Sequence, residues 1–146
     1  IIKNLNVVIV DKNLKIPLNA KVLKNLHEKR IIIFTAKKNR KSQLLEQLGC
    51  EIIEMKLQNN KLNLKKLFNK LYNLKISDLM VEAGGMFFAD LIKNNLVDEI
   101  HIFQAPFIIG TNGIPVIKGT DLKKIRKKLL ETKKFDKDQY FKYEIK

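Results

Sequence analysis

Short apolar runs alternate with longer amphipathic stretches along most of the chain. Val7–Asp11 and Ile31–Thr35 are each four apolar residues closed by a polar one, which is typical of a buried strand. Three further runs repeat this pattern: "CEIIEM" (50–55), "DLMVE" (78–82) and "EIHIFQAPFII" (99–109). We therefore expect five strands, the last of them ended or bent by Pro106.

Three stretches between these runs have the spacing of amphipathic helices. "NRKSQLLEQLG" carries leucines at helical spacing, and Gly49 after them is a common stop signal. "LNLKKLFNKLYNL" places three leucines and Phe68 on one stripe, and "MFFADLIKNN" is the third candidate. Strands that alternate with helices predict a parallel sheet with helices on both faces.

The pattern changes near the end of the chain, where Leu129–Phe135 and Tyr140–Ile145 read as two strands around a short turn. We expect an antiparallel hairpin that closes one edge of the sheet. The predicted fold class is therefore α/β, with a mostly parallel central sheet, helices on both faces and an antiparallel C-terminal hairpin. A length of 146 residues suits one core rather than two, so we expect a single domain over residues 1–146.

The formal net charge of +14 has two interpretations. It can attract phosphate-rich partners, including nucleic acid, or the lysines can simply solvate polar faces. We favour solvation and expect no nucleic-acid partner, because no basic run is interleaved with stacking aromatics. The run "GTDLKKIRKK" (119–128), which includes Lys123 and Lys124, is expected to be an exposed connection.

Other residue types narrow the setting. Cys50 is the single cysteine, so no internal disulfide forms, and with His27 and His101 alone it cannot build a zinc site. No stretch approaches the roughly 20 apolar residues of a membrane span. A reduced, cytoplasmic setting is the default expectation.

Polar residues and glycines follow the predicted parallel strands where each one ends. Because ligands collect at the carboxyl ends of such strands, these residues are expected to share one rim. They are Asp11 and Lys12 after the first strand, Thr35, Lys37, Lys38 and Arg40 at the second, and Glu82, Ala83, Gly84 and Gly85 at the fourth.

The pair Gly84 and Gly85 precedes a predicted helix, and two interpretations of it stay open. Without side chains in the way, a diphosphate can approach the first N–H groups of the helix closely. Alternatively, the glycines serve only the dihedral angles of a tight turn.

The order of motifs around these glycines resembles the reductase domain of the bifunctional riboflavin-biosynthesis deaminase-reductase. Val-Glu-Ala-Gly is followed by an apolar-rich helix, Leu96-Val97-Asp98-Glu99, an apolar strand, Ala105-Pro106 and Gly110. "VVIVDKNLKIPLNAKVL" is similar to the second strand and turn of that family. The resemblance implies the dihydrofolate reductase fold, NADPH as cofactor, and reduction of the ribose of 5-amino-6-(5-phosphoribosylamino)uracil to its ribityl form.

The resemblance also implies roles for individual residues. Glu82 matches the substrate-binding carboxylate of the family, although a glutamate there could instead cap its own helix. Lys12 occupies a cofactor-contacting position that is usually a serine, and no residue is assigned as the catalytic proton donor. The cofactor diphosphate segment corresponds to Gly84, Gly85, Met86, Phe87, Phe88, Ala89 and Asp90.

The chain departs from the family at its start, because the opening strand, its helix and a Ser-Leu-Asp-Gly motif are absent. Three explanations stay open: the sequence is a fragment, the gene has decayed, or a homodimer or partner chain supplies the missing segment. In each case we expect no activity from this chain alone. The alternative function is a basic, non-catalytic module that binds nucleic acid or an acidic partner.

Overall fold

The computed structural model describes residues 5–119 and 125–145. Its chain divides into two compact units, Ile1–Ile76 and Ser77–Lys146. Each unit is described by itself below, and the single domain expected from the sequence stays a prediction. Lys123 and Lys124 of the expected basic connection lie outside the described residues.

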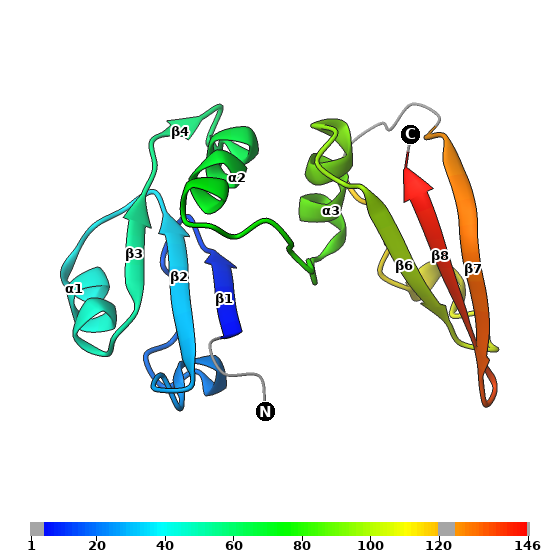
Figure 1. Ribbon diagram of the computed structural model, residues 1–146, viewed down its shortest axis with the longest axis horizontal. Helices are drawn as coiled ribbons and strands as arrows, with labels where there is room; N and C mark the ends of the chain where they lie inside the picture. The colour runs from blue at the N-terminus through cyan, green and yellow to red at the C-terminus, as the bar shows by residue number, and fades with distance from the viewer. Residues whose placement is uncertain (1–4, 120–124, 146) are drawn as a thin grey trace. The chain divides into compact units, whose positions relative to one another are not determined.

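The first unit is built on a parallel sheet in the order β1-β2-β3 (Figure 1). In register, Val7 lies opposite Ile31 and Ile33 opposite Ile52. The bounds confirm the first three predicted strands: β1 is Leu5–Val10, β2 is Lys29–Thr35 and β3 is Glu51–Glu54.

Helices cover both faces of this sheet, as predicted. Side chains of β2 alternate, so Ile31 and Ile33 pack with Leu45 of α1 (Arg40–Gln47) on one face. Ile32 and Phe34 pack on the other face with Leu67 and Leu71 of α2 (Leu64–Asn73). All four β2 side chains are fully buried, which makes this strand the centre of the core.

Local signals fix the connections of the first unit. Asn39 caps α1 by accepting from the N–H groups of Lys41 and Ser42, and Gly49 after the helix has φ of 102°.

The sequence did not predict the hairpin of β4 (Leu57–Gln58) and β5 (Lys61–Leu62). Its turn residues Asn59 and Asn60 both have positive φ, which asparagine tolerates. A short 3-10 turn, η1, spans Lys21–Leu23.

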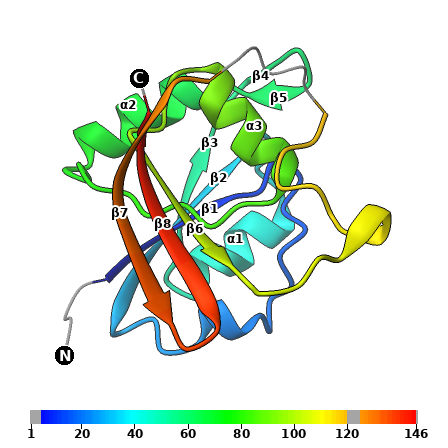
Figure 2. The same cartoon turned by 90° about the vertical axis from the view of Figure 1, so that its right-hand side faces the viewer.

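The second unit holds a helix and an antiparallel sheet in the order β6-β8-β7 (Figure 2). The predicted hairpin is confirmed, because Phe135 pairs with Asp138 across a two-residue turn. The elements are α3 (Gly85–Lys93), β6 (Glu99–Gln104), the 3-10 turn η2 (Gly110–Asn112), β7 (Lys127–Phe135) and β8 (Asp138–Ile145).

Three details of the predicted sheet are wrong. Residues 78–82 form no strand and pair with none of the described strands; Leu79, Met80 and Val81 are exposed. An apolar run predicts a strand only where a neighbour completes its hydrogen bonds. The sequence placed β6 in the parallel sheet. The strand instead pairs antiparallel with β8, so the hairpin pairs with β6 and not with the β1-β2-β3 sheet. The basic run is not all connection, since Lys127 and Lys128 begin β7.

Candidate functional site

The carboxyl ends of β1 and β2 form the strand-end rim of the first unit. The N–H of Asp11 donates to the carbonyl of Phe34 at 2.9 Å, and the N–H of Ala36 donates to the carbonyl of Lys12 at 3.0 Å. Asp11, Lys12 and Thr35 therefore share one rim, as predicted.

Two side chains of the rim form hydrogen bonds with the backbone of the adjacent loops. The Asp11 carboxylate accepts from the N–H of Ile16 at 2.8 Å. The fully buried Thr35 hydroxyl donates to the carbonyl of Lys12 at 3.2 Å and accepts from the N–H of Lys37 at 3.3 Å. These groups shape the rim and are already paired.

Lys12 reaches from the rim to the β4–β5 turn. Its ammonium donates to the backbone carbonyl of Asn60 at 2.8 Å and to the Asn60 side-chain oxygen at 3.3 Å. A lysine ammonium has three donors, so one N–H is left for another acceptor.

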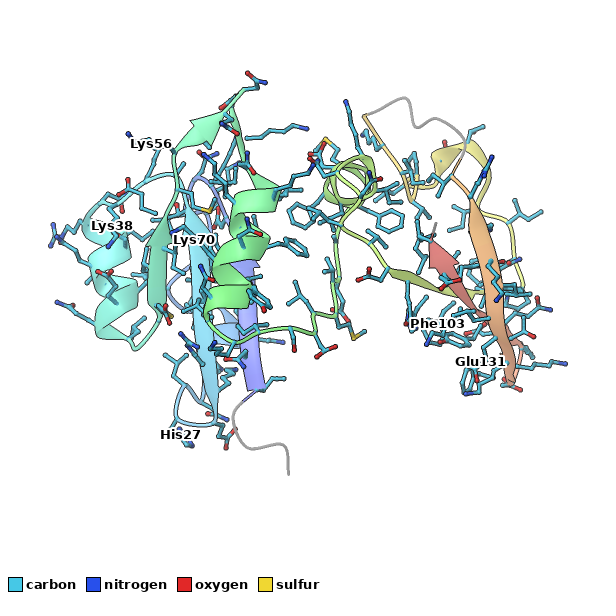
Figure 3. The ribbon with its side chains drawn as sticks, turned by 45° about the horizontal axis from the view of Figure 1, so that its top comes forward. His27, Lys38, Lys56, Lys70, Phe103 and Glu131 are labelled. Atoms are coloured by element: carbon cyan, nitrogen blue, oxygen red, sulfur yellow. The ribbon has the colours of Figure 1, made fainter. Side chains whose placement is uncertain are left out.

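The basic side chains after β2 are exposed. Lys38, which lies beside α1 in Figure 3, forms an ion pair with Glu46 at 3.4 Å. Lys37 and Arg40 form no side-chain ion pair within residues 5–119 and 125–145. This basic group can therefore meet an anion at the rim.

The glycine turn of the second unit leads into α3. Gly84 is the N-cap residue, no side chain of the described residues caps the helix, and its first turn has no acidic residue. The N–H groups of Phe87 and Phe88 both donate to the carbonyl of Gly84, at 3.0 and 3.1 Å. Those of Gly85 and Met86 point out of the helix without an intrahelical acceptor. Such a helix start attracts anions.

The two glycines of the turn are glycine for different reasons. A Cβ on Gly85 would lie 2.6 Å from the carbonyl oxygen of Pro115 and 2.9 Å from that of Val116, so close backbone contact excludes a side chain. A Cβ on Gly84 would meet nothing within 4 Å, and its φ of −72° suits any residue. Neither packing within the described residues nor a dihedral angle requires glycine at position 84.

The remaining predicted residues differ in accessibility. Glu82 is exposed, forms no hydrogen bond or ion pair with the described residues and does not cap α3, which removes the capping interpretation. Met86 is exposed, Phe87, Phe88 and Asp90 are half-buried, and Ala89 is buried. Because these residues belong to the second unit, their predicted closeness to Asp11 and Lys12 stays a prediction.

Sequence reasoning missed a polar network on β6 and β8. Tyr140 hydroxyl and His101 Nδ1 are 2.9 Å apart, and Glu99 contacts His101 at 3.3 Å and Lys142 at 3.0 Å. The Lys142 ammonium lowers the pKa of the Glu99 carboxyl, and Glu99 in turn raises the pKa of Lys142. The register that sets His101 opposite Lys142 depends on the β6–β8 pairing, which the sequence pattern did not predict.

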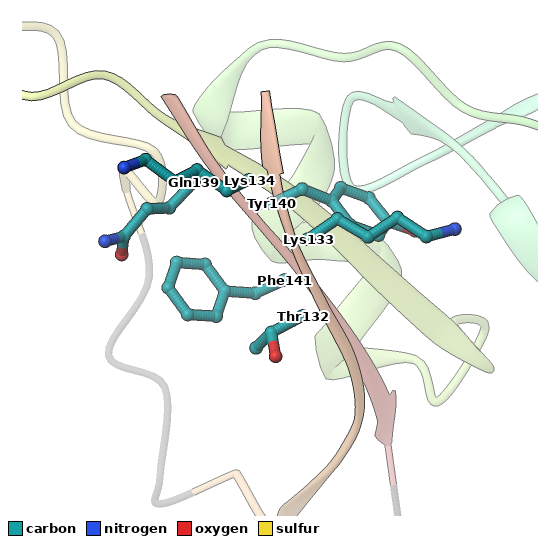
Figure 4. A pocket seen from close by; sticks show the side chains of 6 residues that line it. All are labelled: Thr132, Lys133, Lys134, Gln139, Tyr140 and Phe141. Carbon is teal, nitrogen blue, oxygen red and sulfur yellow. The ribbon is translucent and has the colours of Figure 1, made fainter. Parts of the chain in front are cut away.

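An open hollow of about 390 Å³ lies on the β7–β8 hairpin, and its lining contains none of the predicted site residues (Figure 4). Thr132, Lys133, Lys134, Gln139, Tyr140 and Phe141 line it. None of these side chains was expected to bind ligand, and the exposed lysines around the hollow do not converge on a binding position.

Among the described residues, none of the helices has the length and apolar character that a membrane span needs.

Known proteins match most of this chain. A riboflavin biosynthesis protein RibD of Aquifex aeolicus is 36% identical over 130 residues, covering 85% of this chain and 35% of that protein. A 2,5-diamino-6-ribosylamino-4(3H)-pyrimidinone 5′-phosphate reductase of the same organism is 33% identical, covering 79% and 51%. The chain thus spans between about a third and a half of these relatives.

The fold is also that of a solved structure. RibD of Acinetobacter baumannii superposes with a TM-score of 0.80 at 24% identity, over 95% of this chain and 37% of that one. The predicted α/β, dihydrofolate-reductase-like fold class is thereby confirmed. The sequence profile described as the RibD C-terminal domain matches residues 3–141, and the chain therefore belongs to the RibD C-terminal domain family.

Proposed function

We propose that the protein is an NADPH-dependent reductase that converts 5-amino-6-(5-phosphoribosylamino)uracil to its ribitylamino form. The observation that carries this proposal is the family match over residues 3–141. The second Aquifex aeolicus relative is named as a pyrimidinone 5′-phosphate reductase, and this name supports a reductase of this substrate class.

The glycine turn fits the diphosphate of the cofactor. Gly84 leaves open space, and the outward N–H groups of Gly85 and Met86 are the donors that a diphosphate needs. Residues Gly84–Asp90 would hold the diphosphate. Lys12, in the first unit, would offer its third N–H to the adenosine phosphate of the cofactor. When bound, NADPH supplies the hydride, while the protein supplies binding and orientation.

Glu82 is proposed to bind the base of the substrate. Its carboxylate is exposed and has no partner among the described residues, so it can accept hydrogen bonds from the N–H groups of an aminopyrimidine. These bonds would bind the base and fix its orientation. The proton donor stays unassigned.

A second substrate should be assayed in parallel, because two relatives are named as reductases of a diaminopyrimidinone phosphate. Both candidates present ring and exocyclic N–H groups to a carboxylate. The ratio of kcat/KM for the two compounds decides between them.

The experiment measures NADPH consumption by the protein expressed from its complete coding region, with either substrate. Glu82→Gln should lower kcat/KM by about 10- to 100-fold, because a charge-assisted hydrogen bond is worth about 1.5–3 kcal/mol. Glu28→Gln, at an exposed glutamate before β2, is the matched control and should keep full activity. Equal rates for all three proteins would contradict the role of Glu82, and no cofactor consumption by the wild type would contradict the reductase.

A further inference from the structure

All charged residues in the segment that contains β4, β5 and α2 are basic. Residues 55–77 contain six lysines and no aspartate or glutamate. The lysines are Lys56, Lys61, Lys65, Lys66, Lys70 and Lys75. Outside this segment the first unit contains acidic residues as well as basic ones, and some of them pair, such as Arg30 with Glu51 at 2.6 Å and Lys38 with Glu46.

Because α2 buries its leucines against the sheet, its lysines lie on the exposed side of the helix. Leu64, Leu67 and Leu71 are buried, so Lys65, Lys66 and Lys70 are on the exposed side of the helix. None of these three lysines forms an ion pair within the described residues. Their charge is therefore available to an external anion.

One edge of this exposed side carries an exposed aromatic ring, next to Lys65 and across the helix from Lys70. Tyr72 is 72% exposed, although a tyrosine of a folded domain usually buries much of its ring. Positions 65, 69 and 72 align along the helix because they are four and three residues apart, so Lys65, Asn69 and Tyr72 share one line.

The β4–β5 hairpin extends this surface at the start of α2. The Asn63 side chain, which caps α2 by accepting from the N–H of Lys66, also donates to the Gln58 side chain of β4. Lys56 precedes β4, and Lys75 follows the end of α2; both are exposed and without an ion pair in the described residues (Figure 3 labels Lys56 and Lys70). We call the five lysines 56, 65, 66, 70 and 75 with Tyr72 the α2 basic face.

In contrast to the expectation from the sequence, we propose that the α2 basic face binds single-stranded nucleic acid, an activity separate from the reductase. Lysine ammonium groups would contact the phosphates, and the Tyr72 ring would stack on a base, the combination that binds single strands without sequence preference. An acidic protein would also pair with the lysines, but its carboxylates would not stack on the Tyr72 ring as a base does. The structure thus favours nucleic acid over an acidic protein.

Salt dependence provides the quantitative expectation. For single strands the logarithm of the binding constant falls with the logarithm of salt by about 0.7 per phosphate contact. Five contacts would give a slope of about −3.5, so affinity should fall roughly 100-fold between 50 and 200 mM salt.

The test measures binding of a fluorescent 15-nucleotide single-stranded RNA to the full chain by anisotropy, as a function of salt. Lys65→Gln, Lys66→Gln and Lys70→Gln together should reduce the slope by about 2 and weaken binding at least tenfold at 50 mM salt. The control with the same charge change is Lys15→Gln, Lys21→Gln and Lys24→Gln, at exposed positions of the same unit. This control should lose far less affinity.

Tyr72→Ala separates stacking from charge, because it leaves every lysine in place. We expect about a tenfold loss of RNA affinity with an unchanged salt slope. Equal losses for the two triple variants would overturn the assignment to α2, as would a polyglutamate peptide that competes with the RNA as well as unlabelled RNA does. No binding at 50 mM salt would show that the lysines only solvate the helix.

Discussion

The strand-end rim of the first unit and the glycine turn of the second differ in how their polar groups are used. On the rim, Asp11 and Thr35 bond to neighbouring backbone, and Lys12 bonds twice to Asn60. At the turn, the outward N–H groups of Gly85 and Met86 have no intrahelical acceptor, and Glu82 has no partner among the described residues.

This difference separates residues whose polar groups are paired within a loop from residues whose polar groups stay open to a ligand. Both groups follow a run that the sequence predicted as a strand, and this position does not distinguish them. What distinguishes them is whether hydrogen bonding is already complete within the protein, because completed bonds leave little to gain from a ligand. Substitutions on the rim should therefore affect stability, and substitutions at the turn should affect binding.

Gly85→Ala should produce the largest change in stability. Its Cβ would lie 2.6 Å from the Pro115 carbonyl, and relieving such overlap costs about 1–3 kcal/mol. Urea unfolding measures the loss, and Gly84→Ala serves as the matched control with nearly unchanged stability. Equal stability of the two variants would mean that residues 115–116 move away freely, and that the glycines do not differ.

Thr35→Val should have the next largest effect. The change keeps the side-chain volume but removes the hydroxyl between Lys12 and Lys37, so we expect a loss of about 1 kcal/mol in the free energy of unfolding. NADPH affinity, measured by fluorescence titration, should stay unchanged. A large loss of affinity in a variant of normal stability would place Thr35 in the binding site instead.

Neutralising the basic group after β2 should have a moderate effect on cofactor choice. If Lys37, Lys38 and Arg40 meet the 2′-phosphate, their joint replacement by glutamine should weaken NADPH up to about tenfold and NADH hardly at all. Replacing Lys65, Lys66 and Lys70 by glutamine is the charge-matched control. Equal losses for both cofactors would remove these residues from the 2′-phosphate site.

The Glu99–Lys142 pair should give the smallest effect, because Glu99 is exposed and Lys142 is only half-buried. The lowered pKa of Glu99 means that the pair stabilises above the carboxyl's unfolded pKa and loses this contribution as pH falls through the folded value. The raised pKa of Lys142 adds a corresponding loss at alkaline pH. Glu99→Gln should therefore be less stable than wild type at neutral pH and equally stable in strong acid. A constant difference at every pH would contradict the ion pair.

Much of the fold could be predicted from apolar periodicity. The β1–β3 strands, three helices and the C-terminal hairpin have patterns that depend on local residues and on burial. Pairing partners could not be predicted, because an apolar run does not say which strand lies beside it; this is why residues 78–82 and the direction of β6 were predicted wrongly. The short β4–β5 hairpin was missed because two-residue strands have no measurable period.

The candidate site was predicted to a different extent. Spacing placed Asp11, Lys12 and Thr35 on one rim correctly, but it could not show that their polar groups are already paired. The sequence also could not show why position 85 requires glycine, because the contacting Pro115–Val116 backbone lies 30 residues further along the chain. Contacts at long range are set by the folded backbone rather than by local composition.

Titration of NADPH into wild-type protein and Gly84→Val tests whether the glycine turn holds the cofactor. A Cβ at Gly84 meets no atom within 4 Å and its backbone angles suit valine, so the variant should fold, with only the small loss of stability expected when valine replaces glycine at an N-cap. The branched side chain would stand over the N–H groups of Gly85 and Met86, and we expect at least a tenfold loss of NADPH affinity. Unchanged affinity in the folded variant would contradict the account, because it would show that Gly84 forms a turn and nothing more.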